Sequence, residues 1–570
     1  MILGENQIGK TNLVYALRLV LDPALPDSSR QLRLEDYWDG IPRPLKADCV
    51  IRISVDISDF EEDEGQLAVL AEHLVQPEPM VARLTYEFGP IAGLERAPAT
   101  SGDYEFVCYG GDRLDNSFGY ELRKRMPMEV LHALRDAEGD LARWSKSPLK
   151  PLIDRAQADV ERIDLEALAE GVSKETEKLA ALEPIRAVAD RINAKLQGMA
   201  GTTQAIETAL GFSPADPDKL LRALRLLFDE KKRDISEASL GTANVLYLAL
   251  RSLDLEAQVD EGNREHTFFS IEEPEAHLHP HLQRLVYRSY LRPRQPTGDD
   301  DDEGGRITYL LTTHSPHIAS VTPVDSLILL RRDEDNSTVG VSGCESELSD
   351  DERDDIERYL DVARAEGLFS RAILLVEGDA EKFLVPVLAA RAGYDLDSLG
   401  ISTCSVSGTN FVPYVKFFGP QGLNIPIAVL TDFDPLDGGG SLGQDRVANQ
   451  VLPALLDGDA LPAKRAGRLA LAEANGVFLN QHTFEVDLVR CGYFQSTARA
   501  MEDLCTVEAA VERAKERASK KTLDDEARFL RDIAYVGKGR FAQRLAAYIA
   551  KSKCTQCPEY ILKALKHVTE

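Results

Sequence analysis

The chain has 570 residues, of which 44% are hydrophobic and 28% are charged, enough apolar side chains for several globular domains. The net charge of −29 excludes a generic basic nucleic-acid coat but leaves room for a DNA enzyme with acidic metal sites and local contacts. No apolar run approaches the roughly 20 residues of a membrane span. There is also no signal-peptide pattern, and the scattered cysteines form no disulfide framework. We therefore expect a cytoplasmic protein without a membrane partner.

The first eleven residues contain a phosphate-binding loop pattern, G-x-x-x-x-G-K-T. Its glycines let successive backbone N–H groups point at phosphate oxygens. Lys10 would reach the β- and γ-phosphates of ATP, and the Thr11 hydroxyl would hold Mg²⁺. An apolar helix is expected to follow at 12–21. The expected nucleotide-binding residues are Gly4, Asn6, Gly9, Lys10, Thr11 and Asn12.

Two regions with different hydrophobic patterns follow the loop. Residues 49–60 alternate apolar and polar side chains, and 81–88 and 104–108 do so more weakly, which predicts an antiparallel sheet beside the loop. From 129 to 201 the apolar residues recur at helical spacing. We interpret this region as a helical insertion that serves as a dimerisation arm. The alternative is a helical lid that contacts only its own chain.

Several other sequence patterns are better explained without a functional role. The basic cluster Arg123–Arg125 and the locally basic tail 505–570 are better explained as solvated faces than as DNA contacts. The alternating histidines of the segment 277–281 are more often structural than zinc ligands. The single C-x-x-C at 554–557 lacks the partners of a four-ligand zinc site.

A strong motif lies at residues 267–280. A buried strand, 267–272, ends in Glu272 and Glu273 before a proline. Beside a phosphate loop, Glu272 would enter the Mg²⁺ shell and Glu273 would act as the general base for a water. A second strand, 307–312, precedes His314, which can reach a γ-phosphate. Upstream, the turn with Ser239 and Gly241 offers N–H groups to an anion at a helix start.

A second chemical centre follows in the C-terminal half. A buried strand ends in Glu377, and the strand beginning at Ile427 ends in Asp432 and Asp434. Parallel strands that both end in carboxylates can hold one or two divalent ions roughly 3.5–4 Å apart and position a phosphodiester for in-line attack. Lys538 lies on a glycine-flanked turn before a helix, where it could stabilise charge on a phosphate or remain a surface lysine.

In their order, these motifs resemble two known architectures. The loop at 4–11, the Ser239–Gly241 turn, the acidic strand end at 272–273 and His314 resemble an ABC-type ATPase head, in which two heads sandwich ATP. Glu377 followed by Asp432-x-Asp434 resembles a Toprim domain. The combination resembles the OLD (overcoming lysogenization defect) nucleases. ABC-type heads carry further strands before the loop, so contacts to adenine are not assigned.

The resemblance implies an α/β fold: an ABC-type ATPase head with a helical dimerisation insertion, then an α/β Toprim domain with a helical C-terminal part. The expected boundaries are 1–128 and 206–335 for the head, 129–205 for the insertion, 336–368 for a linker and 369–570 for the Toprim domain. The metal ligands carried over from the family are Glu377, Glu381, Asp432, Asp434, Glu485 and Asp487, and Lys538 fits the family's essential lysine.

The family further implies nicking and cleavage of DNA with Mg²⁺ or Mn²⁺, regulation by ATP, and a role in phage defence or DNA repair. A homodimer or tetramer is expected, with a possible helicase-like or reverse-transcriptase partner. An alternative is an SMC-like structural DNA-binding ATPase with a non-cleaving Toprim domain. A Toprim topoisomerase would need a tyrosine nucleophile in a domain of its own, and the sequence offers no such domain.

Overall fold

The computed structural model describes residues 1–46, 48–94, 98, 100–133, 136–158, 160–200, 208, 210, 216–228, 233–234, 237–276, 278–291, 306–333, 335–436, 438–456 and 460–570. His277 of the histidine pattern and the expected boundary at 205/206 lie outside these residues. Of the remaining histidines, His279 and His281 stack on each other with ring centroids 5.6 Å apart.

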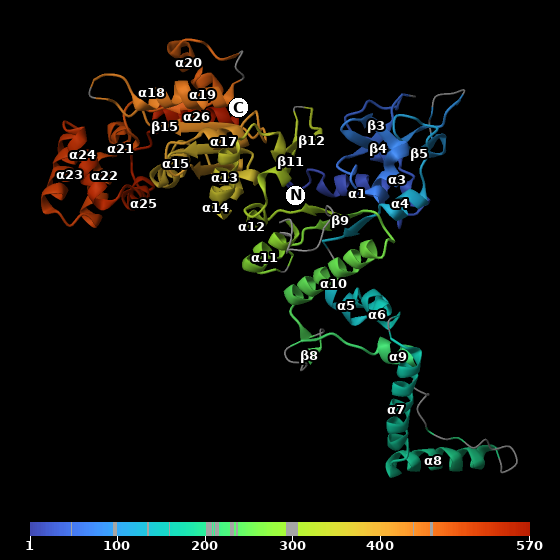
Figure 1. Cartoon of the computed structure of the whole chain (residues 1–570). Coiled ribbons are helices and arrows are strands. Elements are labelled where there is room, and N and C mark those ends of the chain that lie inside the picture. Colours follow the sequence, from blue (N-terminus) through green and yellow to red (C-terminus); the bar gives the residue numbers. More distant parts are fainter. Residues whose placement is uncertain are drawn as a thin grey trace.

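A six-stranded sheet in the order β12-β11-β1-β10-β9-β6 forms the centre of the first half (Figure 1). Its neighbours pair in parallel except β12, which runs antiparallel to β11. The strands are β1 (Ile2–Gly4), β6 (Met128–Leu131), β9 (Thr267–Glu272), β10 (Ile307–Thr312), β11 (Ile328–Arg332) and β12 (Thr338–Ser342). The strands expected at 267–272 and 307–312 are confirmed. The expectation that helical structure starts at Glu129 is wrong, because residues 128–131 pair with β9.

The expected antiparallel sheet is also present. It consists of β2 (Ile51–Ile57), β3 (Leu74–Pro77), β4 (Met80–Pro90) and β5 (Tyr104–Gly110), with β4 between β2 and the other two. Helix α1 (Lys10–Leu21) shares one apolar core with this sheet, in which Val14 and Tyr86 are almost fully buried. Short helices α2 (Asp27–Arg30), α3 (Glu64–Leu70) and α4 (Tyr120–Arg125) complete this part.

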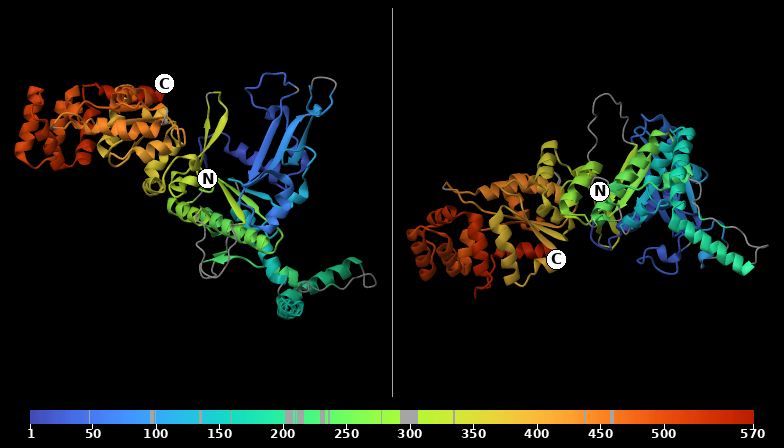
Figure 2. Two further views of the ribbon diagram at one scale, coloured as in Figure 1. Left: turned by 45° about the horizontal axis from the view of Figure 1, so that its top comes forward. Right: turned by 90° about the horizontal axis from the view of Figure 1, so that it is seen from below.

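A helical region projects from the head (Figures 1 and 2). Its outermost helices are α7 (Arg162–Ala180) and α8 (Glu183–Ala200), which extend away from both sheets. The helices closer to the head are α5 (Ala137–Ala142), α6 (Leu149–Ala158), α9 (Pro217–Arg222), α10 (Leu240–Asp260) and α11 (Pro280–Leu291), and β7 (Leu227–Phe228) pairs with β8 (Arg233–Asp234). On the projecting helices Ile163, Leu168 and Met199 are 73%, 66% and 77% exposed.

The segment predicted as a linker, 336–368, is largely built of regular elements. It contains the edge strand β12, then α13 (Asp350–Tyr359) and α14 (Val362–Ala365). Ile356 and Leu360 are buried in a core that extends into both halves of the chain. The segment therefore packs between the two halves as part of their shared core.

The second half is built on a parallel sheet in the order β14-β13-β15-β16, with strands β13 (Ala372–Val376), β14 (Ile401–Ser405), β15 (Ile427–Thr431) and β16 (Val477–Leu479). Around the sheet lie α15 (Asp379–Arg391), α16 (Leu396–Leu399), α17 (Val412–Phe418), α18 (Leu442–Arg446), the π-helical turn η8 (Val447–Val451), α19 (Leu452–Leu455), α20 (Arg465–Leu471) and α21 (Phe484–Leu488). The expected helical C-terminal part consists of α22 (Phe494–Leu504), α23 (Glu508–Lys520), α24 (Glu526–Val536), α25 (Lys538–Ile549) and α26 (Glu559–Thr569).

The two halves share one hydrophobic core. Leu3 and Leu329 of the first sheet belong to the same buried cluster as Ile373 and Val429 of the second. All eight cysteines are free thiols. In the described part of the chain, no helix has both the length and the apolar character needed to cross a bilayer.

Candidate functional sites

The phosphate loop, the acidic strand end and His314 meet at one edge of the first sheet. Because β1, β9 and β10 are parallel and adjacent, their carboxyl ends lie together. Gly4 ends β1 with φ +155°, and a Cβ there would come within 2.9 Å of the Leu330 carbonyl oxygen, so glycine is required at this close approach. Gly9, at φ +105°, directly precedes α1, which places Lys10 and Thr11 in its first turn.

Lys10 is the buried cation of this site. Its Nζ donates to the carbonyl oxygens of Gly4 and Glu5 at 2.8 and 3.0 Å and lies 3.4 Å from His314 Nδ1. His314 Nε2 in turn lies 3.4 Å from Glu273 Oε1. Burial lowers the pKa of Lys10 against the opposing charge of Glu273, and burial together with the Lys10 charge lowers the pKa of His314. A neutral imidazole can therefore lie between the loop lysine and the expected general base.

The structure also shows partners that the sequence did not reveal. His132 Nδ1, just beyond β6, lies 2.7 Å from Glu272 Oε2. Glu275 Oε1 accepts hydrogen bonds from the Thr313 hydroxyl and the His314 N–H at 2.8 and 2.7 Å, and so fixes the turn that carries His314. Both residues follow strands of the same sheet edge, so the strand-end argument could have identified them.

The remaining expected nucleotide contacts are on the surface. Asn6, Thr11 and Asn12 are exposed around the loop. Ser239 is the exposed N-cap of α10, where its hydroxyl accepts from the Thr242 N–H at 3.2 Å. Gly241 lies in the first turn of the same helix.

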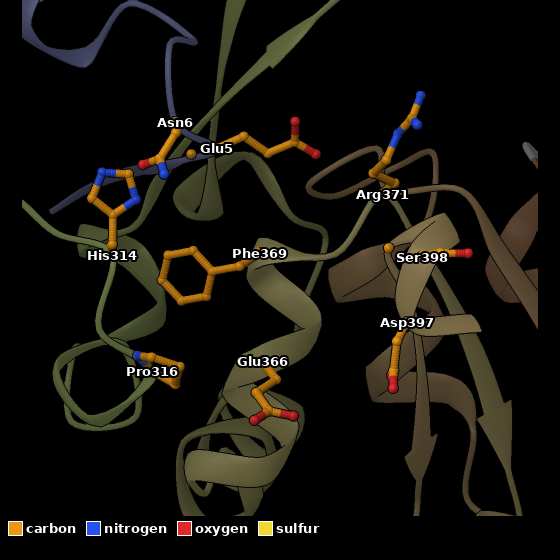
Figure 3. A pocket seen from close by; sticks show the side chains of 11 residues that line it. Glu5, Asn6, His314, Pro316, Glu366, Phe369, Arg371, Asp397 and Ser398 are labelled. Atoms are coloured by element: carbon orange, nitrogen blue, oxygen red, sulfur yellow. The ribbon is translucent and has the colours of Figure 1, made fainter. Parts of the chain in front are cut away.

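A cavity of ≈410 Å³ joins the phosphate loop to the second half of the chain (Figure 3). Glu5 and His314 line it from the head, and Phe369, Arg371 and Ser398 line it from the other side. Next to it, Arg331 of β11 donates to the carbonyl oxygens of Asn424 and Arg371 at 3.2 and 3.0 Å. The phosphate loop thus lies next to the second half of the chain.

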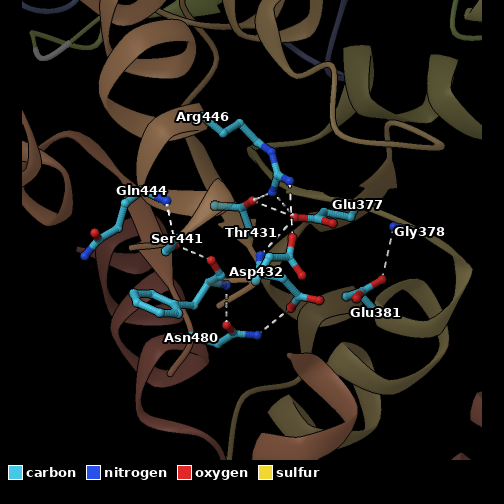
Figure 4. A network of polar contacts seen from close by, with 11 residues as sticks. Glu377, Gly378, Glu381, Thr431, Asp432, Ser441, Gln444, Arg446 and Asn480 are labelled. Atoms are coloured by element: carbon cyan, nitrogen blue, oxygen red, sulfur yellow. Dashed lines mark hydrogen bonds and ion pairs between the residues drawn. The ribbon is translucent and has the colours of Figure 1, made fainter. Parts of the chain in front are cut away.

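The second cluster forms at the carboxyl edge of the second sheet (Figure 4). Glu377 follows β13, and Asp432 and Asp434 follow the adjacent parallel strand β15. Glu381 lies in the first turn of α15, and Glu485 lies in α21. Burial raises the pKa of Asp432, and the charges of Glu377, Glu381, Glu485 and Asp434 raise it further, so these carboxylates lie close enough to Asp432 to interact with it.

Glu377 is the most constrained carboxylate of the cluster. Its Oε1 accepts hydrogen bonds from the Thr431 hydroxyl at 2.6 Å and the Asp432 N–H at 2.9 Å. The Arg446 guanidinium contacts the same oxygen at 2.6 Å and reaches Asp434 Oδ2 at 3.3 Å (Figure 4). Arg446 is only 9% exposed.

The other carboxylates are also bound to protein donors. The Asn480 side-chain amide donates to Asp432 Oδ1, and its carbonyl oxygen accepts from the Phe433 N–H at 2.7 Å. Glu381 Oε2 accepts from the Gly378 N–H at 3.0 Å. Lys538 Nζ lies 3.3 Å from Glu485 Oε1, which places the expected lysine in the cluster.

Crowding of buried acids shifts their proton affinities. Burial and the charge of Glu485 raise the pKa of Glu381 to about 7. Burial and the charge of Glu377 raise the pKa of Asp432 well above its usual range. Burial alone would lower the pKa of Lys538, but the charges of Glu485 and Asp432 raise it overall.

Asp487 differs from the other expected ligands. Its Oδ2 accepts from the Gln481 N–H at 2.8 Å, and its Oδ1 lies 3.9 Å from Arg490. Burial raises its pKa, opposed by these two neighbours. The first contact connects Asp487 to the turn before α21, and the second connects it to the residues that follow this helix.

The side chains of the second cluster have the ligand atoms that a hard divalent cation prefers, but they are not arranged to hold one. These atoms are carboxylate oxygens, and the second oxygen of Glu485 is buried with no hydrogen-bond partner in the described structure. Among the described residues, however, no three histidine, cysteine or acidic side chains are arranged to hold a metal ion. The protein donors named above instead occupy oxygens of these carboxylates, with Arg446 on both Glu377 and Asp434.

Comparisons with known proteins agree with this two-part organisation. Residues 368–434 match the family model described as "Overcoming lysogenization defect protein-like, TOPRIM domain", and 137–319 match an "AAA ATPase domain" model. The OLD nuclease of Thermus scotoductus is 29% identical over 251 residues, 43% of this chain and 45% of that protein. The uncharacterized protein YbjD of Escherichia coli is 30% identical over 163 residues, 28% of this chain and 26% of that protein.

The chain thus spans less than half the length of these two curated relatives. Among solved structures, the C-terminal region of the Burkholderia pseudomallei OLD protein is 38% identical and covers 35% of this chain and 98% of its own length, with a TM-score of 0.32. The C-terminal region of the Xanthomonas campestris OLD protein is 40% identical over 35% of this chain and 95% of its own length, with a TM-score of 0.31.

Proposed function

Because this chain belongs to the OLD family, with an ATPase domain followed by a Toprim domain, we propose that it is a DNA endonuclease that nicks and cleaves DNA with Mg²⁺ or Mn²⁺. One observation carries this proposal: Glu377, Asp432 and Asp434 converge at the end of two adjacent parallel strands, with a lysine beside them. Such a cluster suits phosphodiester hydrolysis, in which two bound cations would polarise the phosphate and the attacking water.

The chain's own residues have distinct roles in this proposal. Glu377, Glu381, Asp432, Asp434 and Glu485 would supply hard oxygen ligands after a rearrangement, since their described positions do not form a metal-holding group. Lys538 is 55% exposed at the rim of the cluster, and its ammonium group remains charged because nearby carboxylates raise its pKa. It can therefore bind a phosphate oxygen of DNA and stabilise the charge that develops there.

The head is proposed to bind ATP and regulate the nuclease. Support comes from the cavity between Glu5 and Arg371, since a ligand in the phosphate loop would change the surroundings of a Toprim-side arginine. Glu273 is proposed as the general base for ATP hydrolysis, with Thr11 and Glu272 in the Mg²⁺ shell. Ser239 and Gly241 would close over ATP held by a second head.

The projecting helices are proposed as the dimerisation arm. Exposed large apolar residues on one helix pair are characteristic of a surface that another chain covers. Ile163, Leu168 and Met199 meet this description, and the arm extends away from the head, where it can reach a second copy. We infer a homo-oligomer, a dimer or a tetramer, that acts on DNA in the cytoplasm.

A second candidate function has one observation in its favour. Because protein donors bind each carboxylate of the cluster, an SMC-like clamp with a non-cleaving Toprim domain is consistent with the geometry. The intact set of Glu377, Asp432, Asp434 and Lys538 favours the nuclease. A role in phage defence or DNA repair, with a helicase-like or reverse-transcriptase partner, is proposed from the family alone.

A plasmid assay decides between these functions. The full-length protein should nick supercoiled plasmid with Mg²⁺ or Mn²⁺ but not with EDTA, and Glu377→Gln should reduce the rate at least 100-fold. Glu473→Gln is the matched control, because Glu473 is an exposed glutamate of the same domain that pairs with Lys563 at 2.9 Å. If Glu377→Gln nicks as fast as the control, the site assignment is wrong. If the parent protein binds DNA without nicking it, the clamp function is correct.

A further inference from the structure

We propose that Arg446 is an internal counter-ion that competes with the divalent cation for Glu377 and Asp434, so that cation binding requires the guanidinium to leave. This inference rests on the proposed nuclease function and adds a regulatory element to the same site. Arg446 would set the cation concentration at which the cluster is loaded.

The first argument is the position of the guanidinium. Nη1 lies 2.6 Å from Glu377 Oε1, Nη2 lies 3.3 Å from Asp434 Oδ2, and Nη1 also donates to the Thr431 hydroxyl. The guanidinium of Arg446 thus bridges Glu377 and Asp434, the carboxylates that follow two adjacent strands. A divalent ion between these two carboxylates would approach the same two side chains whose negative charge the guanidinium now neutralises.

The second argument is that the local backbone brings Arg446 to this position. The Ser441 hydroxyl accepts from the Gln444 N–H at the start of α18 and donates to the Phe433 carbonyl oxygen. A Cβ at Gly443 would come within 1.9 Å of the Asp432 carbonyl oxygen, so α18 lies directly against the strand end. The π-helical turn η8 begins at the next residue, Val447, and π-turns are common at functional sites.

The third argument distinguishes competition from positioning. The Thr431 hydroxyl and the Asp432 N–H already hold Glu377 Oε1 at 2.6 and 2.9 Å. Glu377 therefore keeps its orientation when Arg446 is removed. If Arg446 only oriented Glu377, its loss would weaken cation binding. If it competes, its loss should strengthen binding.

The charge of Arg446 makes the competition unavoidable. A guanidinium does not lose its proton at physiological pH, so it repels any cation that approaches Glu377 and Asp434. Lys538, another cation of the cluster, pairs with Glu485 at 3.3 Å, whereas Arg446 pairs with Glu377 and Asp434. Arg446 is thus the cation that must move.

The test measures Mn²⁺ affinity, without DNA, in full-length protein first treated with EDTA and then dialysed. Titration followed by electron paramagnetic resonance should show that Arg446→Gln lowers the Mn²⁺ Kd about tenfold, as expected for removal of one positive charge a few ångströms from the ion. Arg465→Gln is the matched control, because Arg465 pairs with Asp445 at 2.8 Å outside the cluster and its loss should leave the Kd unchanged.

A second variant covers the case in which Arg446→Gln does not fold. Arg446→Lys keeps a charge but cannot bridge both carboxylates, so its Kd should lie between those of the parent and Arg446→Gln. A Kd equal to or higher than that of the parent in either folded variant would overturn the inference while leaving the nuclease proposal intact. If neither the parent nor the variants bind Mn²⁺ saturably, both proposals are overturned.

Discussion

Replacement of Glu381 by glutamine should stabilise the metal-free protein at alkaline pH and have a much smaller effect in acid. Glu381 is 9% exposed, and burial with the charges of Glu485 and Glu377 raises its pKa from 4.5 to about 7. A carboxyl group whose pKa is raised by folding destabilises the folded state once it ionises. This cost develops as the pH rises from 4.5 to 7 and is constant above that. Glutamine removes the charge and can still accept the Gly378 N–H bond.

The magnitude follows from the pKa shift. The ionised carboxylate costs about 3 kcal/mol at pH 8 and about 0.8 kcal/mol at pH 5, because each pKa unit corresponds to about 1.4 kcal/mol. For a unit of the size of the Toprim domain, the pH 8 value corresponds to a rise in melting temperature of about 6–12 °C, and the pH 5 value to about 2–3 °C.

Differential scanning calorimetry with EDTA at the two pH values measures this difference. Glu473→Gln, which changes an exposed glutamate, should shift the melting temperature by no more than about 2 °C at either pH, since surface substitutions have effects within about 0.5 kcal/mol. Equal stabilisation by Glu381→Gln at both pH values would refute the charge argument, and so would destabilisation at pH 8.

Two further predictions concern the head and the arm. Lys10→Ala should weaken nucleotide binding at least tenfold, as measured by calorimetric titration. The rate of plasmid nicking without ATP should stay unchanged, because Lys10 lies in the phosphate loop and not in the Toprim cluster. Equal ATP affinity of the parent and the variant would contradict the loop assignment. The double variant Ile163→Asp and Leu168→Asp should shift the protein toward monomers, as measured by light scattering. The control Glu166→Gln on the same helix should leave the oligomer unchanged. An unchanged oligomer in the double variant would show that the arm is not an interface.

The sequence predicted the parts of the sites that follow from strand order. Glu272, His314, Glu377 and Asp432 all lie at or within two residues of the carboxyl end of a strand, and the carboxyl ends of adjacent parallel strands lie at one sheet edge. Alternating patterns likewise predicted the antiparallel sheet. These features depend on local sequence and on one rule of topology.

What the sequence could not predict depends on how distant segments meet. Arg446 reaches Glu377 only because the loop before α18 folds back onto the strand end, and nothing in its local sequence separates it from a surface arginine. Residues 128–131 fit a helical spacing with their downstream neighbours, but parallel pairing with β9 makes them a strand. The cavity between Glu5 and Arg371 joins segments from opposite halves of the chain.

The shared core also determines how the protein can be divided experimentally. A Toprim fragment that began at residue 369 would lose Ile356 and Leu360, and it would expose the faces of Ile373 and Val429 that now share a cluster with Leu3 and Leu329. Such a fragment would be prone to aggregate, because a newly uncovered apolar surface of that kind drives self-association. A fragment that begins before α13, at about residue 345, keeps Ile356 and Leu360 but still lacks Leu3 and Leu329. Failure of a shorter fragment to cut DNA would therefore reflect the loss of these buried apolar contacts and would not test the chemistry of its carboxylates.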